Sequence, residues 1–110
     1  MNSIQIIGRL TKDPELTTTK AGQALCRMRV ALPRPGSDAG TVYIDVVAWE
    51  RLAETCGEHL AQGRQVAVSG RLDYSEWSDA EGARHSRHEI VAAGVDFLAQ
   101  PKAKEVVEAG

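Results

Sequence analysis

Apolar and polar residues alternate along four segments of the chain, a pattern typical of strands with one buried and one exposed face. A fifth segment, residues 86–98, is less regular, and its pattern leaves the facing of its residues ambiguous. Between residues 50 and 61 the apolar residues Leu52, Cys56 and Leu60 recur instead at helical spacing. We therefore predict five strands and one helix, which lies between the third and fourth strands. The predicted strands are residues 3–10, 23–32, 41–49, 65–73 and 86–98.

Two glycines interrupt the predicted strands on their apolar faces. Gly8 lies in the first strand and Gly70 in the fourth, and glycine inside a strand favours a bend or bulge. A bent sheet with this order of elements predicts an OB-fold, an all-β Greek-key barrel of five strands with a helix between strands 3 and 4. The stretch from Ser78 to Gly82 is the predicted tip of a long hairpin between strands 4 and 5. We expect residues 1–99 to form this domain and residues 100–110 a short flexible tail.

The net charge of −2 over 110 residues at first argues against a nucleic-acid partner. The charge is segregated, however. Residues 1–36 hold six basic and two acidic residues, whereas residues 37–63 hold one basic and five acidic residues. The acidic block contains the predicted helix, so the strands can still present a basic surface.

Arginine and aromatic residues fall on the polar faces of the predicted strands and in the predicted hairpin. Guanidinium groups neutralise phosphates, and aromatic rings stack on unpaired bases for about 1–3 kcal/mol per base. The alternative is a solvated basic face whose rings pack on the helix or on a partner subunit. The predicted single-strand contact residues are Arg9, Lys12, Arg29, Tyr43, Trp49, Arg71, Tyr74, Trp77, Arg84 and Arg87.

Four motifs, taken in order, resemble the bacterial single-stranded DNA-binding protein family. They are GRLTKDPEL at residues 8–16, WERLAE at 49–54, QGRQVAVSGRL at 62–72 and WSDAEG at 77–82. The resemblance implies an OB-fold, a homotetramer built as a dimer of dimers, and sequence-tolerant binding of single-stranded DNA in replication, recombination or repair. It implies no catalysis, no metal and no cofactor.

Within this resemblance, Trp49 and Trp77 match aromatic positions that stack on bases, and Tyr43 matches a third position where the family often has tryptophan. Asp45 departs from the family, which more usually has a basic or polar residue there. The loop after the second strand lacks the aromatic residue that many members carry. The low number of stacking rings suggests weaker binding than is usual for the family.

The end of the chain is a further departure. Residues 104–110 lack the acidic tip that recruits replication and repair enzymes in housekeeping members, so such recruitment is not expected here. Either a short accessory paralogue or a truncated chain fits this ending.

Subunit contact is expected at an open strand edge. The apolar run at Ile4, Ile6 and Ile7 makes the first strand the predicted oligomer interface. The alternative function is an OB-fold protein-interaction adaptor resembling primosomal replication protein N, and that family is typically dimeric. Solution mass therefore separates the two hypotheses.

The remaining reactive side chains do not predict an enzyme. The three histidines lie in no recognisable nucleophile motif, and Cys26 and Cys56 lack the spacing of a zinc site. We expect both cysteines to be buried thiols, with a disulfide as the alternative. No secretory signal or membrane span is visible in the sequence. Together with this, the resemblance implies a location in the cytoplasm, in association with the nucleoid.

Overall fold

The computed structural model describes residues 1–34, 36 and 40–98. The predicted tail, residues 100–110, lies outside the described residues. The elements are β1 (Ile4–Leu10), β2 (Glu15–Thr18), β3 (Ala24–Pro33), β4 (Thr41–Trp49), α1 (Glu50–His59), β5 (Gln65–Ser78) and β6 (Arg84–Phe97).

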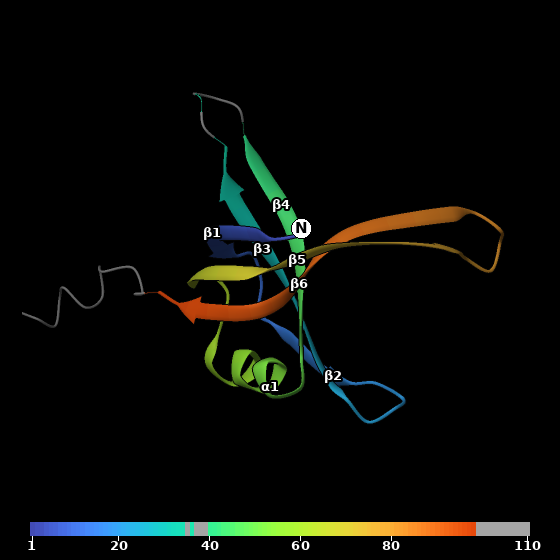
Figure 1. Cartoon of the computed structure of the whole chain (residues 1–110), viewed down its shortest axis with the longest axis horizontal. Helices are drawn as coiled ribbons and strands as arrows, with labels where there is room; N and C mark the ends of the chain where they lie inside the picture. Colours follow the sequence, from blue (N-terminus) through green and yellow to red (C-terminus); the bar gives the residue numbers. More distant parts are fainter. Residues whose placement is uncertain (35, 37–39, 99–110) are drawn as a thin grey trace, which may run out of the picture.

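The strands form one sheet that closes on itself. The order is β1-β5-β6-β4-β3-β2, and β1 also pairs with β3 at Arg9 and Leu10. All pairings are antiparallel except that of β4 with β6. In Figure 1, α1 lies beside the lower end of the barrel. The predicted OB-fold class, with a helix between its third and fourth main strands, is confirmed.

The pattern of the sequence missed the short strand β2. All four of its residues are exposed, so no alternation of apolar and polar residues marks it. It is a strand because its backbone pairs with β3 over Glu15–Thr18.

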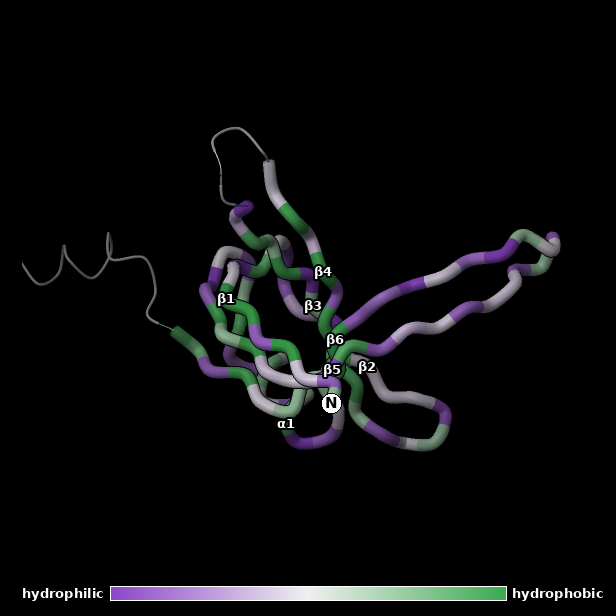
Figure 2. Tube along the Cα trace, turned by 45° about the horizontal axis from the view of Figure 1, so that its top comes forward, coloured by the Kyte–Doolittle hydropathy of each residue, from purple (hydrophilic) through white to green (hydrophobic). Residues whose placement is uncertain are grey.

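The core lies between the inner faces of the strands and α1. Fully buried valines from β3, β4 and β5 meet Ile90 of β6, and the helix adds Ala53 and Cys56. The facing of the last strand, which its pattern left ambiguous, is therefore set by Ile90. The alternation of residues 65–73 predicts that Leu72 points inward with Val66 and Val68, but Leu72 is 40% exposed. The strand has left the barrel at this point and continues into the long β5–β6 hairpin, which projects into solvent and is mostly hydrophilic or neutral (Figures 1 and 2).

Both cysteines are buried and both are free thiols. Burial raises the pKa of each, and burial together with the neighbouring Cys26 raises the pKa of Cys56 to about 12. A neutral buried thiol packs like a small apolar side chain. The expectation of buried thiols rather than a disulfide is confirmed.

Glycine is required at two places where strands approach closely. A Cβ atom on Gly8 would overlap the carbonyl oxygen of Ala31, where β1 passes β3. A Cβ atom on Gly70 would overlap the carbonyl oxygen of Val91, beside the register shift between Ser69 and Gly70. The predicted bulge is confirmed at Gly70, whereas at Gly8 the pairing with β5 is regular and the structure shows a close approach of strands instead. Both close contacts involve backbone, which cannot rotate away.

Replacing either glycine by alanine is expected to destabilise the barrel. The added methyl group must displace a strand, and such overpacking costs about 1–3 kcal/mol or more. Urea unfolding of Gly8→Ala and Gly70→Ala measures the loss against the unchanged chain.

Gly94→Ala is the matched control, because a Cβ atom there meets only the Ser69 hydroxyl at 3.4 Å, an ordinary contact. Equal unfolding midpoints for Gly70→Ala and Gly94→Ala would contradict the close approach.

Candidate nucleic-acid interface

The register of the strands aligns side chains in rows on the outer face of the barrel. Residues that pair across strands lie on the same face of the sheet. One row passes from Asp73 in β5 through Glu89 in β6 and Asp45 in β4 to Arg29 in β3. We call Asp73, Glu89 and Asp45 the acidic row. It lies at the centre of the face that was predicted to be basic.

A shallow cleft of about 170 Å³ lies on this face. Four of its lining residues are basic and two are acidic, and Glu89 borders it through ion pairs. We call it the charged cleft. Its lining residues are Lys12, Glu15, Arg27, Met28, Arg29, Asp45, Val46, Val47 and Arg87.

Each basic side chain in the charged cleft has a carboxylate partner. Arg29 lies 3.1 Å from Asp45, and Glu89 lies 3.5 Å from Arg27 and 3.8 Å from Arg87. A fourth pair joins Lys12 to Glu15 at 3.5 Å. All four pairs are at least partly exposed, so each contributes little to stability, on the order of 0–1 kcal/mol. The basic groups are therefore neutralised within the protein but remain accessible.

Three of the predicted contact residues, Lys12, Arg29 and Arg87, meet in the charged cleft. Arg27 lies with them and was not among the predicted contact residues. The alternation of β3 could have identified Arg27 as a contact residue, because Arg27 and Arg29 are two residues apart and therefore lie on the same face of the strand.

Two predicted aromatic residues lie on the same outer face, in β4. Tyr43 is 51% exposed, and the Arg29 guanidinium carbon lies 5.1 Å from the centre of its ring. Trp49 is less exposed and ends the strand, immediately before Glu50, whose φ of 52° turns the chain into α1. The guanidinium over Tyr43 makes a cation–π contact.

Trp77 lies on the outer face of the β5–β6 hairpin. Its ring stacks against the ring of its cross-strand partner His85, with centroids 5.5 Å apart and planes 19° apart. The Arg87 guanidinium carbon is 5.3 Å from the Trp77 ring centre. Trp77 therefore continues the surface of the charged cleft outward along the hairpin.

Tyr74 lies on the opposite face of the hairpin, because it is three residues from Trp77 and strand residues alternate. Its ring is 4.7 Å from that of His88, and its hydroxyl donates to Glu76 at 2.7 Å. Arg84 also donates to Glu76, at 2.6 Å. The predicted residues Tyr74 and Arg84 thus form a second cluster, which shares no face with Trp77.

Arg9 and Arg71 lie outside the charged cleft. Arg9 donates to the backbone carbonyl of Gly63 at 3.1 Å and borders a separate hollow near β1 and β3. Arg71 lines another hollow at the base of the hairpin, beside Ser69 and Gly70. The structure therefore divides the predicted contact residues among several surfaces.

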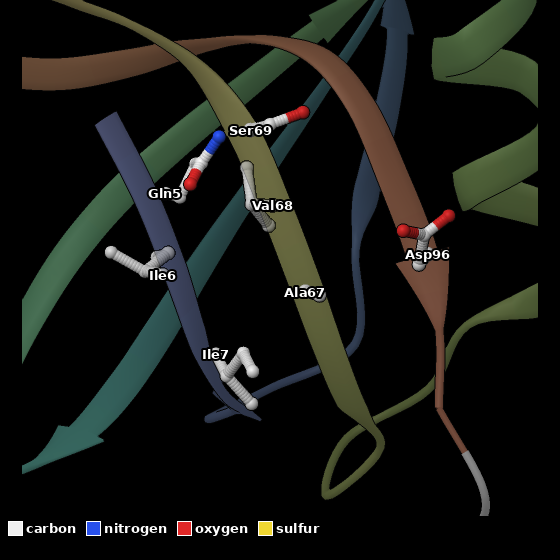
Figure 3. A pocket seen from close by; sticks show the side chains of 7 residues that line it. All are labelled: Gln5, Ile6, Ile7, Ala67, Val68, Ser69 and Asp96. Atoms are coloured by element: carbon white, nitrogen blue, oxygen red, sulfur yellow. The ribbon is translucent and has the colours of Figure 1, made fainter. Parts of the chain in front are cut away.

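The predicted oligomer residues divide between the two faces of β1. Ile4 and Ile6 pack against the core, whereas Ile7 is 56% exposed. Ile7 lines a hollow of about 600 Å³ with Ala67 and Asp96, on the outer face of β1, β5 and β6 (Figure 3). β3 pairs with β1 only at Arg9 and Leu10, so in the described residues no strand covers the edge of β1 before them.

Over residues 1–34, 36 and 40–98, no three His, Cys, Asp or Glu side chains converge into a set that could hold a metal ion. In the same part of the chain no helix has the length and apolar character of a membrane span.

Comparison with known proteins gives a consistent result. The sequence model of the single-strand binding protein family matches residues 1–98. The chain belongs to this family. Membership agrees with the expectation of a binding protein rather than an enzyme.

Three curated relatives are named single-stranded DNA-binding protein. The protein of Treponema pallidum is 42% identical over 103 residues, which is 89% of this chain and 58% of that protein. The protein of Caldanaerobacter subterraneus is 38% identical over 106 residues, or 93% of this chain and 70% of that protein. The protein of Helicobacter hepaticus is 37% identical, and the match covers 88% of this chain and 61% of that protein. The chain thus spans about 58–70% of these three relatives.

Asp79 organises the hairpin tip next to Trp77. Its Oδ1 accepts hydrogen bonds from the backbone N–H groups of Glu81 and Ala83, both at 2.9 Å, and its Oδ2 lies 2.8 Å from Nε2 of His85. The hydrogen bond with His85, followed by that with Ala83, lowers the pKa of the Asp79 carboxyl. The carboxylate therefore holds both the turn and the histidine that stacks on Trp77.

We expect the hairpin tip to loosen in acid. Because the pKa of Asp79 is lower in the folded hairpin than in an unfolded chain, its stabilisation is fully present at neutral pH. It is lost as the pH falls through the folded pKa. Carboxyl titration by NMR should give a midpoint below the ordinary aspartate value, and the amides of Glu81 and Ala83 should lose protection below it, relative to their intrinsic exchange rates at the same pH.

Asp79→Ala should expose the same two amides at neutral pH. Glu81→Gln is the control, because no side-chain contact of Glu81 orders the tip in the described residues. Unchanged amide protection in Asp79→Ala would contradict the role of the carboxylate.

Proposed function

We propose that this protein binds single-stranded DNA with little sequence preference and protects it during replication, recombination or repair in the cytoplasm. The single observation that carries the proposal is the shared outer face on which Tyr43 and Trp77 lie beside the arginines of the charged cleft. Family membership and the names of the relatives support it.

The two kinds of side chain act on different parts of an unpaired strand. Guanidinium groups of Arg29 and Arg87 contact phosphates, and their charge attracts the strand whatever its sequence. The rings of Tyr43, Trp49 and Trp77 stack on bases, each of which offers a flat face. Duplex DNA lacks splayed bases, so we propose that it binds more weakly.

The second cluster, Tyr74 with Arg84, extends the proposed contact surface to the other face of the hairpin. A strand reaches both faces only if it passes around the hairpin, so we propose that the DNA wraps there. Arg9 and Arg71 then serve as outlying phosphate contacts along the path.

We further propose a homotetramer assembled as a dimer of dimers. Two features support it: the uncovered edge of β1, which offers backbone hydrogen-bonding groups, and the apolar outer face around Ile7. Edge pairing of β1, with Ile4 and Ile6 beside the contact, would make the dimer. Stacking of the Ile7 faces would join two dimers.

An OB-fold adaptor that binds protein is the second candidate. The acidic row favours it, because three adjacent carboxylates suit a basic polypeptide better than a phosphate backbone. A dimeric mass together with absence of single-strand binding would support the adaptor.

Titration with oligo(dT) should quench tryptophan fluorescence, with an affinity that falls as salt rises. Removing the stacking ring in Trp77→Ala should weaken binding by about 1–3 kcal/mol, the value of one stacked base. Fluorescence anisotropy of a labelled oligonucleotide measures this independently of the tryptophan.

His59→Ala is the matched control, because this exposed ring lies on α1, away from the charged cleft. Absence of any salt-sensitive binding by the unchanged protein, or equal affinity for duplex DNA, would refute the proposed function.

Ile7→Asp should reduce the solution mass from that of a tetramer, because it places charge on the proposed apolar contact. Light scattering coupled to size exclusion measures the mass. Leu16→Asp is the control, since Leu16 is also an exposed apolar residue but lies on β2. A tetramer in both variants would place the contact elsewhere.

A further inference from the structure

Arg29 is held by two partners at once. Its guanidinium carbon lies 5.1 Å from the centre of the Tyr43 ring, and its Nη1 lies 3.1 Å from Oδ1 of Asp45. The ring attracts the positive charge of the guanidinium, whereas the Asp45 carboxylate accepts a hydrogen bond from Nη1.

Arg87 repeats this arrangement on the neighbouring strand. Its guanidinium carbon lies 5.3 Å from the Trp77 ring centre, and its Nη1 lies 3.8 Å from Oε1 of Glu89. The same Glu89 oxygen also lies 3.5 Å from Nη1 of Arg27. Each of the two stacking rings is therefore attached, through an arginine, to a carboxylate.

The two carboxylates are neighbours. Asp45 and Glu89 are directly opposite each other in the parallel pairing of β4 with β6, and Asp73 lies on the far side of Glu89. Like charges directly opposite on one face repel. In the free protein, the ion pairs with the arginines offset the repulsion between these carboxylates.

We propose that Asp45 and Glu89 compete with the DNA phosphates for Arg29 and Arg87, and so set the affinity and the salt dependence of single-strand binding. This inference rests on the proposed function. A phosphate needs the N–H donor of Arg29 that Asp45 occupies, and at Arg87 it replaces Glu89, whose Oε1 lies 3.8 Å from Nη1, as the neighbouring anion. Binding therefore exchanges one anion for another at each arginine. The exchange leaves Asp45 and Glu89 facing each other without their partners, which opposes binding.

The ion pairs are strong enough to change the affinity for single-stranded DNA and weak enough for a phosphate to displace the carboxylates. The side chains of Arg29 and Asp45 are 45% and 38% exposed, whereas Glu89 is 15% exposed. An exposed ion pair of this kind corresponds to about a two- to fivefold change in an equilibrium constant. Glu89 holds two arginines and is less exposed, so its effect should be the larger.

The test measures binding of a labelled oligo(dT) by the full chain at about 50 and about 200 mM salt. Asp45→Asn should bind about two- to fivefold more tightly, and Glu89→Gln at least as much. The plot of log affinity against log salt should steepen by up to about 0.7 for Asp45→Asn, because an arginine without its carboxylate adds a full phosphate contact. Asp45→Glu, which keeps the competing carboxylate, should restore the native affinity and slope.

Asp73→Asn is the matched control. It removes the same charge from the same row, but in the described residues Asp73 has no ion-pair partner. Its variant should tighten binding less than Asp45→Asn and leave the salt slope unchanged. Thermal unfolding checks that every variant is folded, and Glu89→Gln serves if Asp45→Asn is not.

Two failures are distinguishable. If the unchanged protein does not bind oligo(dT), the proposed function is wrong. If it binds, but Asp45→Asn and Asp73→Asn change affinity and slope equally, only the general charge of the face matters and the competition is refuted.

Discussion

Closure of the sheet through β1 is the constraint on which the rest of the structure depends. This strand pairs with β5 along most of its length and with β3 at its end, so a single strand joins the two edges of the sheet. The join requires the bare backbone of Gly8, because β1 passes too close to β3 for a side chain. Once the sheet is closed, one face of each strand except the short β2 becomes interior. The apolar residues of each alternation then meet α1 in a common core, and the polar residues are left on a continuous outer surface.

The same closure brings residues that are far apart in the sequence into lateral rows. Arg29, Asp45 and Glu89 come from three strands, yet register makes them neighbours. This explains why the net charge of −2 is a poor guide to the partner. The basic residues of the charged cleft are each paired with a carboxylate, so the sum of charge on this face is small while the local field is not uniform. For the proposed binding, the important quantity is the ease with which a phosphate would replace a carboxylate at each arginine.

Local patterns predicted the elements but not their lateral neighbours. The pattern of apolar and polar residues identified the main strands, and helical spacing identified α1, because both patterns follow from burial of one side of an element. The pattern did not predict the short strand β2, because none of its residues is buried. It predicted the wrong orientation for Leu72, because that strand continues beyond the barrel.

For the site, the alternation in each strand showed that Arg9 and Arg71 lie on the outer surface. The outer surface of a barrel faces several directions, however, and only the register of the strands shows that these two residues lie outside the charged cleft. The parallel pairing of β4 with β6, which places Asp45 beside Glu89, cannot be predicted from the sequence of either strand alone.

The arginines also show why stacking and phosphate binding need not exclude each other. A guanidinium group offers a flat face to a ring and a row of N–H donors at its edge. A carboxylate and a phosphate both require the edge, so only one of them can be bound well at a time. The guanidinium carbon of Arg29 lies 5.1 Å from the Tyr43 ring centre, and that of Arg87 lies 5.3 Å from the Trp77 ring centre, so each arginine contacts a ring and a carboxylate at the same time. In the proposed binding, exchange of the anion would leave this ring contact in place, and a base would stack on the open surface of the ring while its phosphate took the position of the carboxylate.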